Sequence, residues 1–132
     1  MNEPIWLSRQ VVEILHLEQI AEHGGRPGVR DANALESALA RPRQQFTYRR
    51  STTLPRLAAT LCIGLAKGHP FVDGNKRAAL LATYSFLAIN GLLLDAAETD
   101  TAETVEAVAA GDMRETALAS WIAAHVRSQP SA

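Results

Sequence analysis

The chain has 132 residues, 47% of them hydrophobic, and its 13 basic and 14 acidic side chains give a formal net charge of −1. This balance excludes a disordered chain and argues against direct nucleic acid binding, and the length predicts one domain that buries roughly two-thirds of its unfolded surface. The sequence shows no basic leader and no uninterrupted apolar run of about 18 residues, so we expect a cytoplasmic protein without a signal peptide or a membrane span.

The N-terminal third predicts one helix followed by a glycine-rich turn. Residues 5–7 are apolar and predict a short strand. Ser8 is a candidate N-cap, and apolar residues recur at helical spacing from there to His23. The glycine pair 24–25 then ends the helix. We interpret His16, a lone histidine within this helix, as a surface or packing residue.

The next segment predicts a short helix and then a basic loop. Asp31 is a candidate cap for a helix over residues 32–40, which we expect to end before Pro42. Residues 41–50 hold four of the 13 basic residues, together with a proline and aromatic residues, a composition typical of an exposed loop. This loop is either a solvated charged segment or a flap that docks a protein target or partner. Its basic residues are Arg41, Arg43, Arg49 and Arg50.

Two strongly apolar segments, residues 57–66 and 78–89, predict helices buried in the middle of the domain. Cys62 lies in the first of them, and we interpret it as inert core packing. A single cysteine also excludes an internal disulfide and a zinc cluster. Between the two segments, five polar or charged side chains fall within nine residues, and such groups are costly to bury unpaired. They predict a site, and they are His69, Asp73, Asn75, Lys76 and Arg77.

The segment between the apolar helices reads as a short loop that leads into a helix N-terminus. Gly68 is a plausible stop for the first helix, and Pro70 disfavours helix at His69. Asp73 or Asn75 is expected to cap the second helix. The free N–H groups and the dipole at that end favour an anion, and phosphate is the usual occupant.

The side chains of this loop suggest nucleotide chemistry. Gly74 permits close approach of the backbone, while Lys76 and Arg77 add positive charge that suits phosphate. Asp73 has the wrong sign for bare phosphate but suits Mg²⁺ held between phosphates. His69 is then the available general base. The residues alone therefore suggest group transfer from a magnesium-bound nucleotide to a hydroxyl.

The last third predicts two more helices. Residues 92–94 are a short extended run that could pair with residues 5–7. Residues 95–115 hold seven of the 14 acidic residues and predict a solvated helix face, and a closing amphipathic helix covers residues 118–125. The fold class is all-α, a compact bundle of about six helices with a short two-stranded β element as an option. We expect a single domain over 1–127 and a short flexible tail over 128–132.

The central loop resembles the signature of the Fic/Doc family, His-Pro-Phe-x-Asp/Glu-Gly-Asn-x-Arg. Every fixed position is met, by His69, Pro70, Phe71, Asp73, Gly74, Asn75 and Arg77. The resemblance extends to the Doc (death-on-curing) branch through residues 23–31, residues 35–38 and the Asn90-Gly91 pair, and it is weakest after residue 95. It makes the glycine-rich segment 24–28 either a plain connector or a structured loop near the active face.

The resemblance implies a growth-arresting toxin of a toxin–antitoxin pair, which uses ATP and Mg²⁺ to phosphorylate a threonine of elongation factor Tu and so stalls translation. By motif position, His69 is the general base and Asp73 is the Mg²⁺ ligand. Pro70 and Phe71 are structural, and Phe71 anchors the loop in the core. The phosphate-binding set is Gly74, Asn75, Lys76 and Arg77. Lys67 either joins this set or is an ordinary lysine at a helix end.

Two departures favour phosphate transfer over AMP transfer. The AMP-transferring relatives carry Gly where this chain has Lys76, and a second Arg where it has Leu80. An AMP transferase and a non-catalytic module that holds antitoxin or nucleotide remain the alternatives. Many relatives also carry an inhibitory helix with Ser/Thr-x-x-x-Glu-Gly/Ala-Asn, which this chain lacks. We therefore expect a separate antitoxin whose disordered C-terminal segment folds as a helix into an apolar groove.

Overall fold

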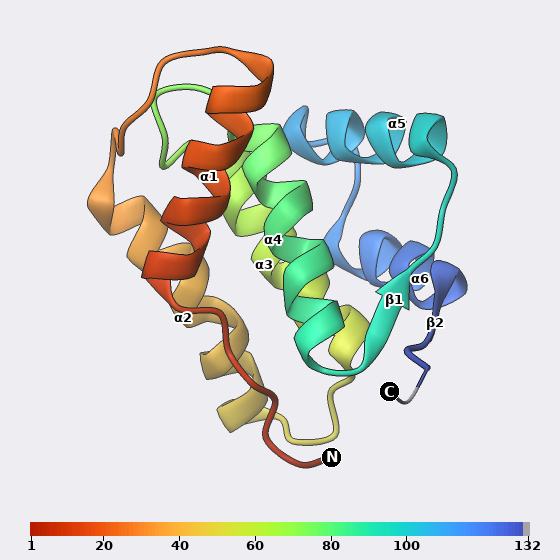
Figure 1. The fold of residues 1–132 in the computed structure, drawn as a ribbon. Coiled ribbons are helices and arrows are strands. Elements are labelled where there is room, and N and C mark those ends of the chain that lie inside the picture. The colour runs from red at the N-terminus through yellow and green to blue at the C-terminus, as the bar shows by residue number, and fades with distance from the viewer. Residues whose placement is uncertain (131–132) are drawn as a thin grey trace.

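The computed structural model describes residues 1–130, which form six helices and one small antiparallel sheet (Figure 1). In chain order the elements are α1 (Arg9–His23), α2 (Ala32–Tyr48), α3 (Leu54–Gly68), α4 (Asn75–Ile89), β1 (Leu92–Leu94), α5 (Glu98–Ala109), α6 (Glu115–His125) and β2 (Val126–Ser128). The mainly helical class and the short two-stranded element are confirmed.

Helix α3 lies at the centre and packs against α2, α4, α5 and α6. Its side chains Leu57 and Leu65 are fully buried, and each buried leucine stabilises the fold by about 1.5–3 kcal/mol. Gly64 lets α2 approach closely, because a Cβ atom at this position would lie 3.0 Å from the Cβ of Ala38. Burial raises the pKa of the Cys62 thiol to about 11, so this cysteine is inert core packing, as predicted.

The predicted first and last helices are both present. The hydroxyl of Ser8 accepts a hydrogen bond from the Val11 N–H and caps α1. The helix ends at Gly24, whose φ is positive at 85°. In α6, Leu118 and Ile122 are buried against the core. The acidic side chains of α5 face solvent while its other face is buried, which confirms the predicted solvated acidic face.

The prediction of a helix ending before Pro42 and a basic loop over residues 41–50 is wrong. Helix α2 continues through Pro42 to Tyr48. Its apolar stripe does not stop at the proline: Leu35, Ala38, Pro42 and Phe46 are all buried at helical spacing. The packing of this stripe outweighs the hydrogen bond that a proline removes from a helix interior.

The predicted pairing of residues 5–7 with residues 92–94 is also wrong. β1 pairs with β2 instead, with Leu92 opposite Ser128 and Leu94 opposite Val126. The N-terminal segment is held by the side-chain amide of Asn90, which accepts from the Ile5 N–H and donates to the Ile5 carbonyl. Ser128, expected to begin a flexible tail, thus ends a strand, and residues 131–132 of that expected tail lie outside the described residues.

Candidate active site

The loop between α3 and α4 begins with a histidine in a left-handed conformation. α3 continues to Gly68, which was predicted to stop it, and His69 then takes φ 48°. This conformation is costly for a residue with a Cβ atom and needs support from its surroundings. Arg30 supplies that support, because its Nε donates to the His69 carbonyl at 2.8 Å and its Nη2 donates to the Gly68 carbonyl at 3.3 Å.

The segment before α2 holds the first half of this loop through its backbone. The N–H groups of Arg30 and Asp31 both donate to the Pro70 carbonyl, at 2.7 and 3.0 Å. The Val72 N–H donates to the Gly28 carbonyl at 3.0 Å. The glycine-rich segment is therefore a structured loop beside the signature and not a plain connector. Figure 1 shows the α1–α2 and α3–α4 connections at the same end of the molecule.

Two side chains of helix α1 contact the second half of the loop. The His16 ring stacks on the Phe71 ring with centroids 3.8 Å apart, and its Nε2 lies 2.8 Å from the Asp73 carbonyl oxygen. The Gln19 amide donates to the Gly74 carbonyl at 3.3 Å. Phe71 is 1% exposed, so its side chain lies in the core beneath the loop. The contact of His16 with the loop was not predicted, because only the fold brings residues 16 and 73 together.

The start of α4 differs from the prediction that Asp73 or Asn75 caps it. The N-cap is Gly74 at φ 71°, and among the described residues no side chain caps this helix. A Cβ atom at Gly74 would collide with the amide of Gln19, so a larger residue would have to displace this side chain and adopt a strained positive φ. The Asn75 amide instead braces the loop, because it accepts from the Phe71 N–H at 2.9 Å and donates to the Phe71 carbonyl at 3.0 Å.

A cleft of about 1110 Å³ opens between this loop and α5. It brings six of the predicted site residues together, namely His69, Asp73, Gly74, Asn75, Lys76 and Arg77. Leu80 and Tyr84 of α4, one side of α5 and the end of α1 with the glycine pair 24–25 also line it. Lys67 does not line the cleft, and its ammonium lies near Gly111 between α5 and α6.

The charges of the cleft are only partly paired with one another. Nζ of Lys76 lies 2.6 Å from Oε1 of Glu106, and both side chains are about half exposed or more. One oxygen of the exposed Asp73 carboxylate accepts from the Arg26 N–H at 3.1 Å. Arg77 borders the same space as the uncapped N-terminus of α4. A helix N-terminus with two cations beside it is suited to phosphate.

Asp73 is better suited to a metal ion that arrives bound to a ligand than to one held by protein side chains alone. Within residues 1–130, no cluster of three or more His, Cys, Asp or Glu side chains could hold a metal ion. Mg²⁺ in nucleotide sites commonly takes one or two carboxylates, and substrate phosphates and water supply the other ligands. The single carboxylate of Asp73, in a cleft suited to phosphate, meets that requirement.

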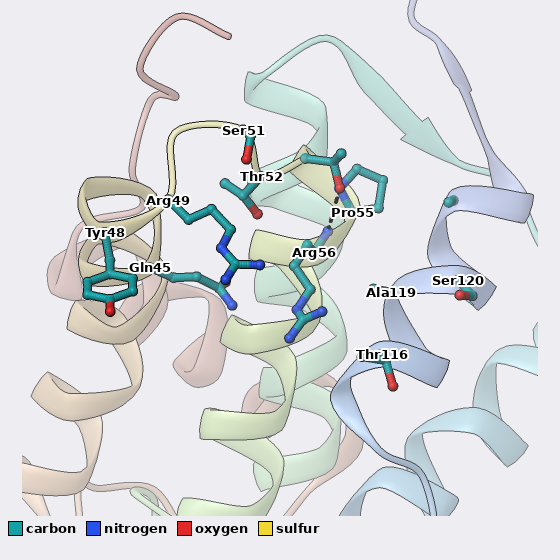
Figure 2. Close-up of a pocket in the computed structure, with 12 residues that line it drawn as sticks. Gln45, Tyr48, Arg49, Ser51, Thr52, Pro55, Arg56, Thr116, Ala119 and Ser120 are labelled. Carbon is teal, nitrogen blue, oxygen red and sulfur yellow. Dashed lines mark hydrogen bonds between the residues drawn. The ribbon is translucent and has the colours of Figure 1, made fainter.

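The four arginines of the basic segment 41–50, considered either a solvated segment or a docking flap, lie outside the cleft. Arg43 and Arg50 lie over the rings of Trp6 and Phe46, with guanidinium carbons 5.7 and 5.4 Å from the ring centroids. Arg49 lines a second hollow of about 720 Å³ (Figure 2), which also includes Arg56 near the start of α3. Arg41 is exposed on α2. Since α3 rises about 1.5 Å per residue, this hollow is roughly 20 Å from the loop at the other end of the helix.

The described part of the chain contains no helix that is both long enough and apolar enough to cross a membrane.

Comparison with known proteins finds two similar proteins. A protein of Escherichia phage P1 named protein kinase doc is 35% identical over 86 residues, which are 65% of this chain and 68% of the relative. A protein of Mycolicibacterium smegmatis named toxin Doc is 47% identical over 76 residues, 55% of this chain and 57% of the relative, less than two thirds of its length.

The model of the Fic/DOC family matches residues 6–87, which are more than half of the chain and include the whole loop with its supports from α1 and from residues 28–31. The chain belongs to the Fic/Doc family.

Proposed function

We propose that this protein is a Doc-like kinase that moves the γ-phosphate of ATP to a Ser or Thr hydroxyl of another protein, and that it acts as the toxin of a toxin–antitoxin pair. The observation that carries this proposal is the cleft in which His69, Asp73, Lys76 and Arg77 surround the uncapped N-terminus of α4. The relatives named protein kinase doc and toxin Doc support both halves of it.

Each residue of the cleft has a chemical role in this proposal. His69 takes the proton of the attacking hydroxyl as general base. Arg77, Lys76 and the N–H groups at the start of α4 hold the phosphates, and Asp73 holds the Mg²⁺ that accompanies ATP and neutralises phosphate charge. Asn75 serves the phosphate site through the shape of the loop, because its amide is bonded to the Phe71 backbone.

Phosphate transfer is favoured over AMP transfer by two side chains that line the cleft. Lys76 places a cation where AMP-transferring relatives have a bare glycine, and Leu80 places an apolar group where they have a second arginine. Without that arginine the far end of the triphosphate has no planar donor to hold it. We infer that ATP binds in the reverse sense, with the γ-phosphate beside His69.

The test uses ATP labelled separately at the α and the γ position, with purified protein and a bacterial cell lysate. We expect label only from γ-labelled ATP, on a Ser or Thr of elongation factor Tu, with release of ADP. Label from the α position with release of pyrophosphate would replace the proposal with AMP transfer. No transfer from either position, with folded protein that still binds ATP, would leave the non-catalytic binding module.

The partner in this proposal is a cognate antitoxin that acts with the toxin in the bacterial cytoplasm. Its disordered C-terminal segment folds as a helix on an apolar surface. The outward face of α1 offers such a surface, because Val11, Ile14 and Leu17 are 41, 48 and 53% exposed at a spacing of three residues. Leu17→Glu should weaken antitoxin binding and leave phosphate transfer unchanged.

A growth experiment tests the toxin function directly. Expression of the wild type alone should stop growth, and harmless expression of folded protein would contradict the proposal that the protein is a toxin.

A further inference from the structure

One face of α1 is built against the loop that carries the family signature. His16 and Gln19 are 2 and 3% exposed, although both side chains are polar. Each uses its polar group on a loop carbonyl: Nε2 of His16 lies 2.8 Å from the Asp73 oxygen, and Nε2 of Gln19 lies 3.3 Å from the Gly74 oxygen. Figure 1 shows the C-terminal half of α1 lying beside the start of α4.

The chemistry of the His16 contact fixes its tautomer. A carbonyl oxygen only accepts, so Nε2 of His16 must carry the proton and donate it. The ring is also held in place by the nearly parallel Phe71 ring, at 3.8 Å and 6°. Two independent contacts, one to a side chain and one to the backbone, therefore determine how His16 meets the loop.

These contacts orient the peptide units that lead into α4. In a trans peptide the carbonyl and the following N–H point in opposite directions. A carbonyl of Asp73 held toward His16 thus directs the Gly74 N–H away from α1. The Gly74 carbonyl, held by Gln19, also accepts the first helical hydrogen bond from the Ala78 N–H at 3.0 Å.

We propose that His16 is a positioning residue for the phosphate and metal site, with Gln19 as its second contact. By holding the Asp73 carbonyl, His16 sets both the direction of the Gly74 N–H offered to phosphate and the backbone from which the Asp73 carboxylate extends. The loop would otherwise be free to turn at Gly74, whose left-handed φ of 71° reflects its lack of a side chain. The catalytic consequence of this proposal rests on the proposed kinase function, but the structural consequence does not.

The test separates the ring from its hydrogen bond. His16→Phe keeps an aromatic ring on Phe71 and removes the donor, whereas His16→Gln keeps an N–H donor of similar reach and removes the ring. Ile122→Val, a buried change on α6, serves as the control for a general loss of stability. Gln19→Leu removes the other contact and carries the test if His16→Phe does not fold.

Two measurements are made on each variant. The first is amide hydrogen exchange at Val72 and Arg26, whose N–H groups bond to Gly28 and to the Asp73 carboxylate. The second is the kcat of phosphate transfer per folded molecule. We expect His16→Phe to speed exchange at both amides and to lower kcat by roughly 10- to 100-fold, the usual effect of losing an outer support of a metal site. His16→Gln should restore most of the slow amide exchange and most of kcat. Ile122→Val should change neither the exchange nor kcat.

For Gln19→Leu we expect faster exchange at the Ala78 N–H and a lower kcat. Wild-type exchange and kcat in His16→Phe, or in Gln19→Leu where the former does not fold, would overturn the proposal. An effect of His16→Gln as large as that of His16→Phe would also overturn it, because the donor would then not be the group that matters. If the wild type itself transfers no phosphate, the proposed function fails, and the exchange measurement still decides whether His16 positions the loop.

Discussion

Lys76 at the start of α4 and Glu106 on α5 form an ion pair across the cleft, with Nζ and Oε1 2.6 Å apart. The Glu106 carboxylate therefore binds the Lys76 ammonium, which the proposed phosphate site needs. An exposed ion pair contributes only about 0.2–1 kcal/mol, so phosphate can displace the carboxylate at small cost. We therefore expect the pair to lower the affinity for ATP without preventing its binding.

Glu106→Gln should raise the affinity for ATP, because Lys76 no longer has to leave a carboxylate. The upper limit is about fivefold, which corresponds to about 1 kcal/mol at 25 °C. An ATP titration of both proteins at low and high salt measures this, and the difference should shrink at high salt because screening weakens the pair. Equal affinity at low salt would show that Lys76 does not reach the nucleotide. Glu103→Gln, also on the exposed side of α5, is the matched control.

Removal of the His69 imidazole should lower phosphate transfer by roughly 10² to 10⁴, the usual effect of losing a general base. The left-handed backbone at this position, φ 48°, makes asparagine a better replacement than alanine, because asparagine tolerates that conformation. His69→Asn should therefore keep the thermal midpoint of the wild type, whereas His69→Ala should lose some stability. Near wild-type transfer in a folded His69→Asn protein would remove His69 from the mechanism.

Asp73→Asn should weaken the response to Mg²⁺ and the activity together, because an amide is a poorer ligand for this ion than a carboxylate. The affinity for ATP in the presence of EDTA should stay about the same. The carbonyl of residue 73 still bonds to His16, so the loop should keep its shape. A Mg²⁺ titration of phosphate transfer checks this prediction, and an unchanged titration curve would contradict the assignment of Asp73.

Stability against acid should depend on Glu115 at the start of α6. Burial on its own would raise the pKa of this carboxyl, but hydrogen bonds from Thr60 and Arg56, together with the charge of Arg56, outweigh burial and hold the pKa below its usual value. A carboxyl with a depressed pKa stabilises the folded state above its unfolded pKa, and this stability is lost as the pH falls through the folded pKa. Glu115→Gln should thus lower the thermal midpoint at neutral pH and match the wild type in strong acid. A midpoint difference that stays constant with pH would contradict this account.

The parts of the molecule that the sequence predicted are those in which local pattern and tertiary packing agree. The apolar runs that became α3 and α4 are buried where they were expected, and the polar residues between them meet at one cleft. The failures are of a different kind. Pro42 indicated a helix end, but the buried Phe46 one turn later keeps α2 intact.

The strand partner of β1 and the role of His16 could not be predicted from the neighbouring sequence. The strand that pairs with Leu94 lies 32 residues away at Val126, and the carbonyl that His16 holds lies 57 residues away at Asp73. Neither contact leaves a periodic pattern in the sequence. A lone buried histidine is distinguished from a packing residue only by the group it faces, and that group is known only once the helices are placed.

The last prediction concerns Lys76, one of the two side chains by which the proposed site differs from that of AMP-transferring relatives. Lys76→Gly restores the residue of AMP-transferring relatives and also releases Glu106, so the cleft loses one cation and gains one unpaired carboxylate. Both changes disfavour phosphate, and transfer from γ-labelled ATP should fall. The variant should not begin to transfer AMP, because Leu80 still leaves the far phosphate without a planar donor. The double variant Lys76→Gly with Glu106→Gln separates the two effects: it should recover the part of the loss that came from the unpaired carboxylate and none of the part that came from the missing ammonium. Transfer from α-labelled ATP by Lys76→Gly alone would show that residue 76 decides which phosphate reacts, whatever stands at position 80.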